Sequence, residues 1–395
     1  MRFLHTSDWH LGRTLHGVDL IEAQRAVLQQ IVQLVTQPAD GIPIDAVLVS
    51  GDIYDRAVPP VEAVTLLAEV LAELIRHTAV VITGGNHDSA IRLGFGSALF
   101  TDRLQVRTSL ATVGEPILLR DTAVYALPYL DPDIARNAFS TDGEPLARSH
   151  QAVMATAMDA VRLDLRSRPT GTRAVVMAHA FVMGGAESDS ERTIAVGGVD
   201  QVSSATFAGV DYVALGHLHR AQRISHDGAT VVRYSGSLLR YSFSERQQQK
   251  SVTLVDLLPD GSVSTSLVEL RQPRGMSELS GSLADLTTDP AHEPLVSDWV
   301  RVTVTDRHRP DQMFDRVKSR FPHVLQVFHI PEGSVAAGGA ALPVGAERSF
   351  SARELGADFV QHVTGSAADP VELELFEQAY QECVNDQSLL NGGRV

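Results

Sequence analysis

The chain has 395 residues, 44% hydrophobic and 21% charged, which is typical of a folded protein of two or three domains. Its net charge of −15 argues against a generally basic, nucleic-acid-binding surface, and its single cysteine, Cys383, excludes an internal disulfide. The first residues lack an apolar stretch of signal-peptide length, and no apolar run approaches the roughly 18 residues of a membrane span. We therefore expect a cytoplasmic protein.

Strand-like and helix-like segments alternate in the N-terminal part of the chain. Short apolar runs predict strands, and apolar positions spaced by three and four predict amphipathic helices. The strands are expected at 2–6, 45–50 and 79–83, and the helices at 20–36 and 60–76. This β-α-β-α-β order predicts an α/β core with a largely parallel first sheet.

The middle of the chain is less regular. We expect strands within 117–127 and at 173–178 and 211–216, and a helix at 149–166. Three further short strands are expected at 230–235, 251–257 and 263–269. Their close spacing predicts antiparallel pairing in a second sheet.

The pattern breaks near residue 271. A helix-like segment at 276–286 precedes a strand at 299–305, a helix at 310–320 and a strand at 324–330, which together predict a small β-α-β unit. A Gly/Ala-rich stretch predicts a linker, and amphipathic helices are expected at 351–363 and 370–385. The expected domains are 1–270, 271–331, the linker 332–346 and the helical region 347–395.

Polar residues that suit metal binding follow five of the predicted strands. Side chains two residues apart in an extended segment point the same way, so Asp8 and His10 can hold one ion together, and His217 and His219 can reach one ion each of a close pair. Loops at the ends of strands are where α/β proteins gather functional groups. The candidate ligands are Asp8, His10, Asp52, Asn86, His179, His217 and His219, with His87 and Asp88 beside them.

The ligand types narrow the chemistry. Carboxylate, imidazole and amide groups without a thiolate suit Mn²⁺, Fe or Zn²⁺. Seven ligands exceed the need of one ion, whereas two ions about 3.5–4 Å apart with a bridging carboxylate would use them all. Any one of these residues alone is more often a turn or capping residue. All five segments together predict a two-metal site.

The motif series DxH…GDxxD…GNHD…H…GHxH resembles the calcineurin-like metallophosphoesterase superfamily. The segments HTSDWHLGRTLHG, GDIYDRAVPP and GSLLRYSFSE resemble one branch of it, the bacterial SbcD family of nuclease subunits. The resemblance covers roughly residues 1–270 and extends beyond them only in layout. It implies an α/β, two-sheet sandwich flanked by helices, followed by a small β-α-β capping domain and C-terminal helices.

The resemblance also assigns roles to residues. It implies that Asp8, His10 and His219 hold one ion and that Asn86, His179 and His217 hold the second, with Asp52 between them. His87 would lie over the substrate phosphate as the catalytic residue, and Asp88 would orient it by a hydrogen bond. The implied activity is that of a Mn²⁺-dependent DNA exonuclease and endonuclease in DNA repair, recombination and replication, acting at the nucleoid.

Several residues near the motifs have open roles. Archaeal and eukaryotic relatives carry histidine at the position of Asp55, where a turn-stabilising carboxylate is the simpler interpretation. Arg13 and His16 are candidates for contact with a backbone phosphate, or for a solvated loop. We expect Tyr241 and Phe243 to pack beneath the metal loops.

Residues 345–395 carry nine acidic and three basic residues, a poor surface for duplex DNA. A helical face of Leu373, Phe376, Ala379, Tyr380 and Val384 predicts docking on another protein, or on the chain itself. The resemblance implies that the partner is the coiled-coil base of an SbcC-like ATPase. It also implies a homodimer through 60–76 and 91–100, within a heterotetramer.

Two alternatives to a nuclease remain. One is a small-molecule phosphodiesterase or phosphatase on the same metal core, although the extra residues after position 270 argue against it. The other is a scaffold that assembles the ATPase without catalysis. The sequence contains no GxxxxGK[ST] motif, so an ATP site of that type is expected on the partner.

Overall fold

A computed structural model describes residues 1–140, 143–192, 194, 201–225, 228–332, 356–357 and 369–378. The chain divides into two units, Met1–Glu332 and Gly333–Val395. In the second unit residues 370–378 are helical, within the predicted helix 370–385. The predicted linker 332–346 and helix 351–363 lie almost entirely outside the described residues. Among the described residues, no helix has both the length and the apolar character to cross a bilayer.

The first unit is built on two six-stranded sheets. The first has the order β16–β15–β1–β4–β5–β6, in which β1, β4, β5 and β6 run parallel. Its strands are β1 (Arg2–Thr6), β4 (Ala46–Ser50), β5 (Ala79–Thr83), β6 (Leu104–Arg107), β15 (Ser251–Leu257) and β16 (Val263–Glu269). The predicted parallel β-α-β-α-β core is confirmed.

The second sheet has the order β13–β14–β12–β9–β8–β7, with four parallel strands at its centre and an antiparallel strand at each edge. Its strands are β7 (Ile117–Leu119), β8 (Thr122–Ala126), β9 (Arg173–His179), β12 (Tyr212–Gly216), β13 (Gln222–Ile224) and β14 (Val231–Tyr234).

The predicted antiparallel pairing of the late strands is correct for β15 with β16, but their predicted placement in the second sheet is wrong. Strand β14 lies parallel to β12, whereas β15 returns to the first sheet and pairs antiparallel with β1. There, Val255 and Leu257 pack with Phe3 between the two sheets. Closeness in sequence did not reveal which sheet edge would bury these side chains.

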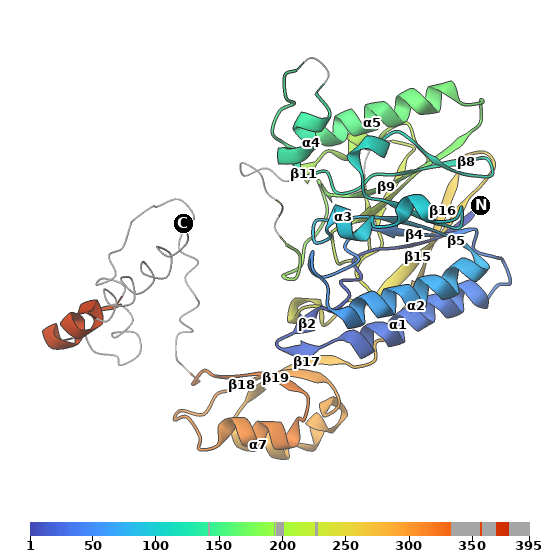
Figure 1. Cartoon of the computed structure of the whole chain (residues 1–395). Coiled ribbons are helices and arrows are strands. Elements are labelled where there is room, and N and C mark those ends of the chain that lie inside the picture. Colours follow the sequence, from blue (N-terminus) through green and yellow to red (C-terminus); the bar gives the residue numbers. More distant parts are fainter. Residues whose placement is uncertain are drawn as a thin grey trace. The chain divides into compact units, whose positions relative to one another are not determined.

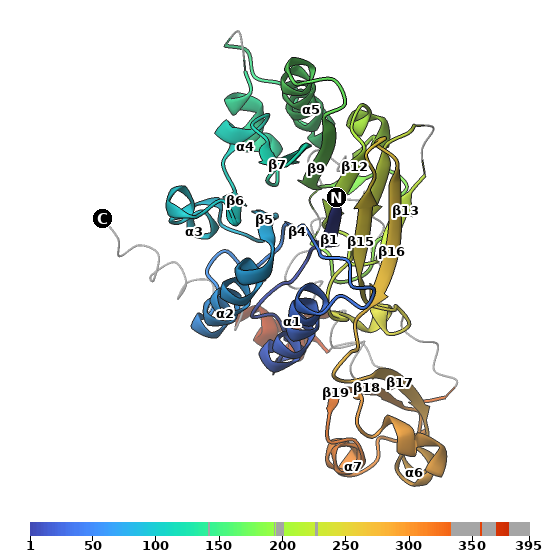
Figure 2. The same cartoon turned by 90° about the vertical axis from the view of Figure 1, so that its right-hand side faces the viewer.

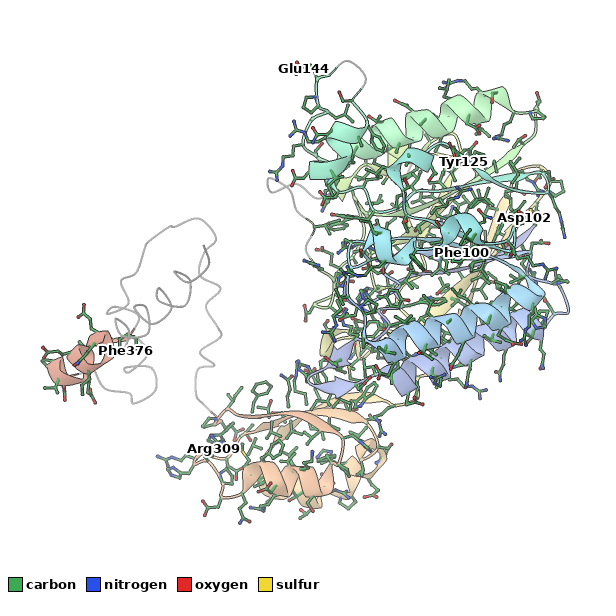
Figure 3. The ribbon with its side chains drawn as sticks, viewed as in Figure 1. Phe100, Asp102, Tyr125, Glu144, Arg309 and Phe376 are labelled. Atoms are coloured by element: carbon green, nitrogen blue, oxygen red, sulfur yellow. The ribbon has the colours of Figure 1, made fainter. Side chains whose placement is uncertain are left out.

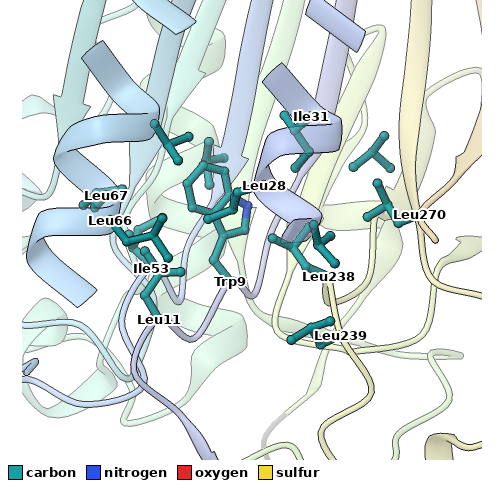
Figure 4. Packing of buried hydrophobic residues seen from close by; sticks show 14 of the residues in the cluster. Trp9, Leu11, Leu28, Ile31, Ile53, Leu66, Leu67, Leu238, Leu239 and Leu270 are labelled. Carbon is teal, nitrogen blue, oxygen red and sulfur yellow. The ribbon is translucent and has the colours of Figure 1, made fainter. Parts of the chain in front are cut away.

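Helices cover both outer faces of the paired sheets (Figures 1 and 2). The amphipathic helices α1 (Ile21–Thr36) and α2 (Val61–His77) pack on the first sheet, and α5 (His150–Ser167) packs on the second. Trp9 lies fully buried beneath α1 and α2, beside Leu28, as expected of an anchor for its loop (Figure 4). The layers are therefore helix, sheet, sheet and helix, which confirms the predicted α/β sandwich.

A three-stranded parallel sheet follows, formed by β17 (Met276–Gly281), β18 (Trp299–Val304) and β19 (Val324–His329). Helices α6 (Leu283–Thr288) and α7 (Met313–Arg320) pack on it around a small core that includes Leu286, Val302 and Phe321. The prediction of a helix over 276–286 is wrong for its first half, because pairing with β18 makes that half a strand. We call residues 276–329 the β17–β19 module.

Shorter elements complete the described part of the chain. The strands are β2 (Thr14–Leu15), β3 (Val18–Asp19), β10 (Phe181–Val182) and β11 (Gln201–Val202). The remaining α-helices are α3 (Ala90–Leu93) and α4 (Pro132–Ala138). The 3₁₀ turns are η1 (Ser97–Leu99), η2 (Leu110–Thr112), η3 (Ser204–Phe207), η4 (Phe243–Glu245) and η5 (Pro290–Leu295).

Candidate metal centre

The loops that carry the predicted ligands meet at one edge of the sandwich. Strands β1, β4 and β5 of the first sheet and β9 and β12 of the second all lead to this edge, because they run parallel within their sheets. Backbone hydrogen bonds join the first two loops, from Asp8 N to Gly51 O (3.1 Å) and from His10 N to Asp52 O (3.0 Å). Ligands separated by more than 200 positions in sequence therefore become neighbours.

One group of donor atoms comes from Asp8, His10 and His219. A donor atom from each lies within 4.8 Å of the other two, and all three residues are buried. The Nε2 atoms of His10 and His219 face one another at 3.0 Å. This is the set predicted for one of the ions.

A second group surrounds the side-chain oxygen of Asn86. Its Oδ1 lies 2.9 Å from His179 Nε2 and 3.3 Å from His217 Nδ1. The Nδ1 of His179 lies 3.0 Å from the carbonyl oxygen of Ser50, to which it can donate its proton and so leave Nε2 free as a ligand. These three residues are the set predicted for the other ion.

Asp52 lies between the two groups. Its Oδ2 is 3.7 Å from His10 Nε2 and 3.4 Å from His179 Nε2, so one oxygen faces both sets of imidazoles. Its Oδ1 accepts a hydrogen bond from the backbone N–H of His87 at 2.9 Å. This position matches that of a carboxylate bridging two ions.

The backbone around these ligands is strained. Asp8, His10, Asp52 and His217 have positive φ angles of 53°, 45°, 51° and 107°, a region that side-chain-bearing residues rarely adopt. Such conformations cost on the order of 1–3 kcal/mol each and persist where the surroundings enforce them. Gly85 has a steric role, because a Cβ there would lie 2.1 Å from Asp52 Oδ1.

Burial and mutual charge shift the acidity of the cluster. Burial raises the pKa of Asp8 to about 6, although His179 and His219 act in the opposite direction. Burial would also raise the pKa of Asp52, but the nearby His179, His10 and His87 outweigh it and hold that pKa well below its usual range. Burial would lower the pKa of His179, yet Asp52 raises it to about 9. Cations would relieve the cost of holding these carboxylates together away from water.

The donor set fits metal ions. The Nε2 atoms of His10 and His219 meet face to face at 3.0 Å, and Asn86 Oδ1 faces the imidazoles of His179 and His217. The ligands are hard or intermediate oxygen and nitrogen donors, which suit Mn²⁺, Fe or Zn²⁺. The residues present can therefore hold two divalent cations on either side of Asp52.

His87 faces this cluster but is oriented differently from the prediction. Its Nδ1 lies 2.6 Å from the backbone carbonyl oxygen of Asp55, so Nε2 is turned toward Asp52 Oδ2 at 3.9 Å. The prediction that Asp88 orients His87 by a hydrogen bond is wrong. The Asp88 carboxylate instead accepts hydrogen bonds from the backbone N–H groups of Ile53, Tyr54 and Gly85, and thereby joins two ligand loops.

Asp55, Arg13 and His16, whose roles the sequence left open, lie in two different places. Asp55 Oδ1 lies 3.6 Å from both His10 Nδ1 and Arg13 Nη1, so Asp55 and Arg13 border the imidazole of His10 on its other ring nitrogen. His16 lies away from them and stacks on Phe243 at 5.7 Å between ring centroids. Tyr241 and Phe243 are buried, which confirms that they pack beneath the loops.

Sequence reasoning missed four buried polar residues that support the ligands. Gln24 donates hydrogen bonds to the carbonyl oxygens of Trp9 and His10, while Ser190, Glu245 and Lys250 lie behind His219. The signal for Gln24 was available, since it is a polar residue on the core-facing side of α1 beside Val27 and Leu28. The other three have no local pattern, and only the tertiary fold brings them together.

Comparison with a known protein family agrees with this geometry. The sequence profile described as calcineurin-like phosphoesterase matches residues 1–221, which contain every predicted ligand. Among solved structures the chain is similar to a dimetal phosphatase from Danio rerio, with 11% sequence identity and a TM-score of 0.40. That alignment covers 69% of this chain and 99% of the other.

Proposed function

Because this chain belongs to the calcineurin-like phosphoesterase family, and is therefore a metal-dependent phosphoester hydrolase, we propose that its substrate is DNA. It acts as an SbcD-like nuclease subunit, an exonuclease on duplex ends and an endonuclease on hairpins and single strands. The proposed metal is Mn²⁺, and the proposed partner is an SbcC-like ATPase. The proposed role is DNA repair in the cytoplasm.

The observation that carries the proposal is the attachment of the β17–β19 module beside the metal centre. The guanidinium of Arg301, on β18, lies 4.2 Å from the ring centroid of Phe243. Phe243 belongs to the segment 236–245, whose Tyr241 ring lies 5.4 Å from that of His10. A hydrolase of small phosphoesters does not require such a module, whereas a long polymer needs contacts beyond the reacting phosphate.

Basic residues in one segment of the module support a nucleic-acid substrate, although residues 276–329 as a whole carry six basic and eight acidic residues. Residues 301–320 contain six basic and three acidic residues, within a chain of net charge −15. Arg307 and Arg309 are exposed on the loop after β18, and Arg309 projects outward from the module (Figure 3). Such side chains suit contact with backbone phosphates, while the metal ions supply positive charge at the centre itself.

The geometry suggests how the residues assist hydrolysis. Bound cations would neutralise phosphate oxygens and lower the pKa of a water toward about 7. Asp52 holds the two ligand groups together, and the strained loops fix the directions of their donor atoms. His87 can donate its Nδ1 proton to the carbonyl oxygen of Asp55, which directs its Nε2 toward the cluster. In its doubly protonated form the ring would also carry a proton on Nε2, with which it would bind a phosphate oxygen or protonate the leaving oxygen.

An exposed apolar surface supports the proposed homodimer. Val61, Ile91, Phe95 and Leu99 are 76%, 87%, 85% and 87% exposed. Phe100, beside them in sequence, is 39% exposed (Figure 3). Phe95 and Phe100 line one hollow beside α2, and apolar side chains gathered in this way commonly mark protein interfaces. We propose that the ATPase partner binds residues 347–395. In this region Phe376, on the helix 370–378, is 38% exposed.

The test compares linear duplex and hairpin DNA with bis(p-nitrophenyl) phosphate, in Mn²⁺ and in chelator, with and without the ATPase. We expect weak DNA cleavage by the chain alone and ATP-dependent cleavage only with the partner. A chain ending at residue 346 should keep the first activity and lose the second. Efficient hydrolysis of the small diester without DNA cleavage would favour the small-molecule alternative, and cleavage that survives thorough chelation would refute the metal mechanism.

A further inference from the structure

Behind His219, on the side away from the other ligands, lies a buried polar chain. The Nδ1 of His219 is 2.5 Å from Ser190 Oγ, which in turn donates a hydrogen bond to Glu245 Oε1. The other oxygen of Glu245 lies 2.6 Å from Lys250 Nζ. Glu245 and Lys250 are 0% and 2% exposed, so both charges are held away from water.

The direction of each hydrogen bond in this chain is fixed by chemistry. An ammonium can only donate and a carboxylate only accepts, so the Ser190 proton points toward Glu245. The Ser190 oxygen then accepts the Nδ1 proton of His219. The imidazole is thereby held with a lone pair on Nε2, the nitrogen that faces His10 Nε2 at 3.0 Å.

The backbone of His219 is held by the same region. Its N–H donates to Glu191 Oε1 at 2.7 Å, and its carbonyl oxygen accepts from Lys250 Nζ at 2.9 Å. The carbonyl oxygen of Ser190 accepts a hydrogen bond from Arg13 Nη2 at 2.9 Å, which joins this region to the loop that carries Asp8 and His10. Both the ring and the peptide of His219 are therefore fixed by side chains that do not face the ions.

We propose that Ser190, backed by the Glu245–Lys250 pair, positions the metal-binding nitrogen of His219 and so sets the affinity of one of the two ion sites. Ser190, Glu245 and Lys250 are positioning residues rather than catalytic ones, because they reach the ions only through His219. The proposal rests on the metal dependence of the family and not on the choice of DNA as substrate.

The two ion sites differ in this respect. His179, on the other side of Asp52, is oriented by the backbone carbonyl of Ser50, which no side-chain substitution removes. A change at Ser190 is therefore expected to weaken the site of Asp8, His10 and His219 and to leave the other site unaffected. Removing a group that orients a metal-bound histidine typically costs about 10- to 100-fold in metal affinity.

The experiment is calorimetric titration of the full chain with Mn²⁺. Ser190→Ala removes the hydroxyl that joins His219 to Glu245. Ser190→Thr keeps that hydroxyl, and Ser244→Ala removes a different hydroxyl, one that accepts the backbone N–H of Asp189 in the same segment at 3.2 Å. We expect the unsubstituted chain, S190T and S244A each to bind two equivalents of Mn²⁺ with the same affinities. S190A should bind one equivalent of Mn²⁺ with unchanged affinity and the second about 10- to 100-fold more weakly.

Thermal unfolding without metal serves as the control for folding. The proposal is overturned if folded S190A binds both ions as tightly as the unsubstituted chain. It is also overturned if S190T or S244A loses as much affinity as S190A, because the segment as a whole would then matter rather than the hydroxyl. A chain that binds two ions but does not cut DNA would refute only the nuclease proposal and leave this one intact.

Discussion

Charged side chains are buried at one region of the molecule and exposed at another. The first region is the metal edge, the edge of the sandwich where the candidate ligands from Asp8 to His219 meet, and the second is the β17–β19 module. At the metal edge, Asp8 and Asp52 are 0% and 2% exposed and adopt rarely populated backbone conformations. In the module the core is apolar, and charged residues such as Arg307 and Arg309 lie on the surface. The metal edge gives up stability to fix the positions of a few atoms, whereas the module presents exposed charges on a regular framework of strands and helices.

This contrast predicts where substitutions will be tolerated. A strained and buried cluster has a single working arrangement, so a small change removes either a ligand or the support of one. An exposed charge works through the summed field of its neighbours, so its loss is partial. Substitutions at the metal edge should therefore abolish chemistry, and substitutions in the module should weaken substrate binding.

The largest effect is expected from Asp52→Asn. The amide keeps the size of the side chain but removes the negative charge that faces both groups of imidazoles. Bound ions supply several kcal/mol of transition-state stabilisation, so we expect kcat on a model phosphodiester to fall about 10³-fold or more. Mn²⁺ titration should show weaker binding at both sites. The matched control is Asp102→Asn, at an exposed aspartate before β6. Normal turnover by D52N would end the bridging interpretation.

The next effect is expected from His87→Gln, which should separate chemistry from metal binding. Because the imidazole faces the ions without belonging to either predicted ligand set, both Mn²⁺ ions should remain bound. A proton-transferring residue contributes about 10²–10⁴-fold, so DNA cleavage should fall by that factor. A p-nitrophenolate leaving group needs no proton, and its release should fall less. His77→Ala, at an exposed histidine on α2, is the control. Equal losses on both substrates would indicate charge stabilisation rather than protonation.

The sequence predicted which residues meet at the metal edge because a local pattern in the sequence marks each of them. Each ligand follows a short apolar run, and the runs that end before Asp8, Asp52 and Asn86 are buried, mutually parallel strands of one sheet. Once the strands are parallel, their ends must lie at one edge. The convergence of the ligands therefore followed from the strand pattern.

What the sequence did not predict depends on contacts between distant segments. The return of β15 to the first sheet, and the strand at 276–281, are decided by which neighbour offers unpaired backbone groups. Asp88 accepts hydrogen bonds from Ile53 and Tyr54 because the two loops meet, and no spacing within GNHD indicates that meeting. The contact of the Glu245–Lys250 ion pair with His219 could not be predicted either, because the fold brings these segments together and no local spacing does.

A moderate effect is expected in the module from Arg307→Ala and Arg309→Ala, made singly and together. If each arginine neutralises one DNA phosphate, each substitution should reduce the salt dependence of DNA binding by about one unit of slope. Hydrolysis of bis(p-nitrophenyl) phosphate should be unchanged, because no base or distant phosphate is present. Arg166→Ala, at an exposed arginine on α5, is the control. Equal losses in R166A would show that net charge, rather than the module, governs binding.

The smallest effect concerns the joint between the two regions, the contact of Arg301 with Phe243. The guanidinium also lies 2.9 Å from Glu278 and from Gln326, so a single Arg301→Met variant changes more than one interaction. A double-mutant cycle with Phe243→Leu isolates the ring contact, for which we expect a coupling of about 0.5–1 kcal/mol in urea unfolding. If the module and the sandwich unfold in one transition, this coupling contributes to the stability of the whole unit. Two separate transitions and zero coupling would mean that the module is held beside the metal edge by other contacts, such as the ion pair of Arg246 with Glu278.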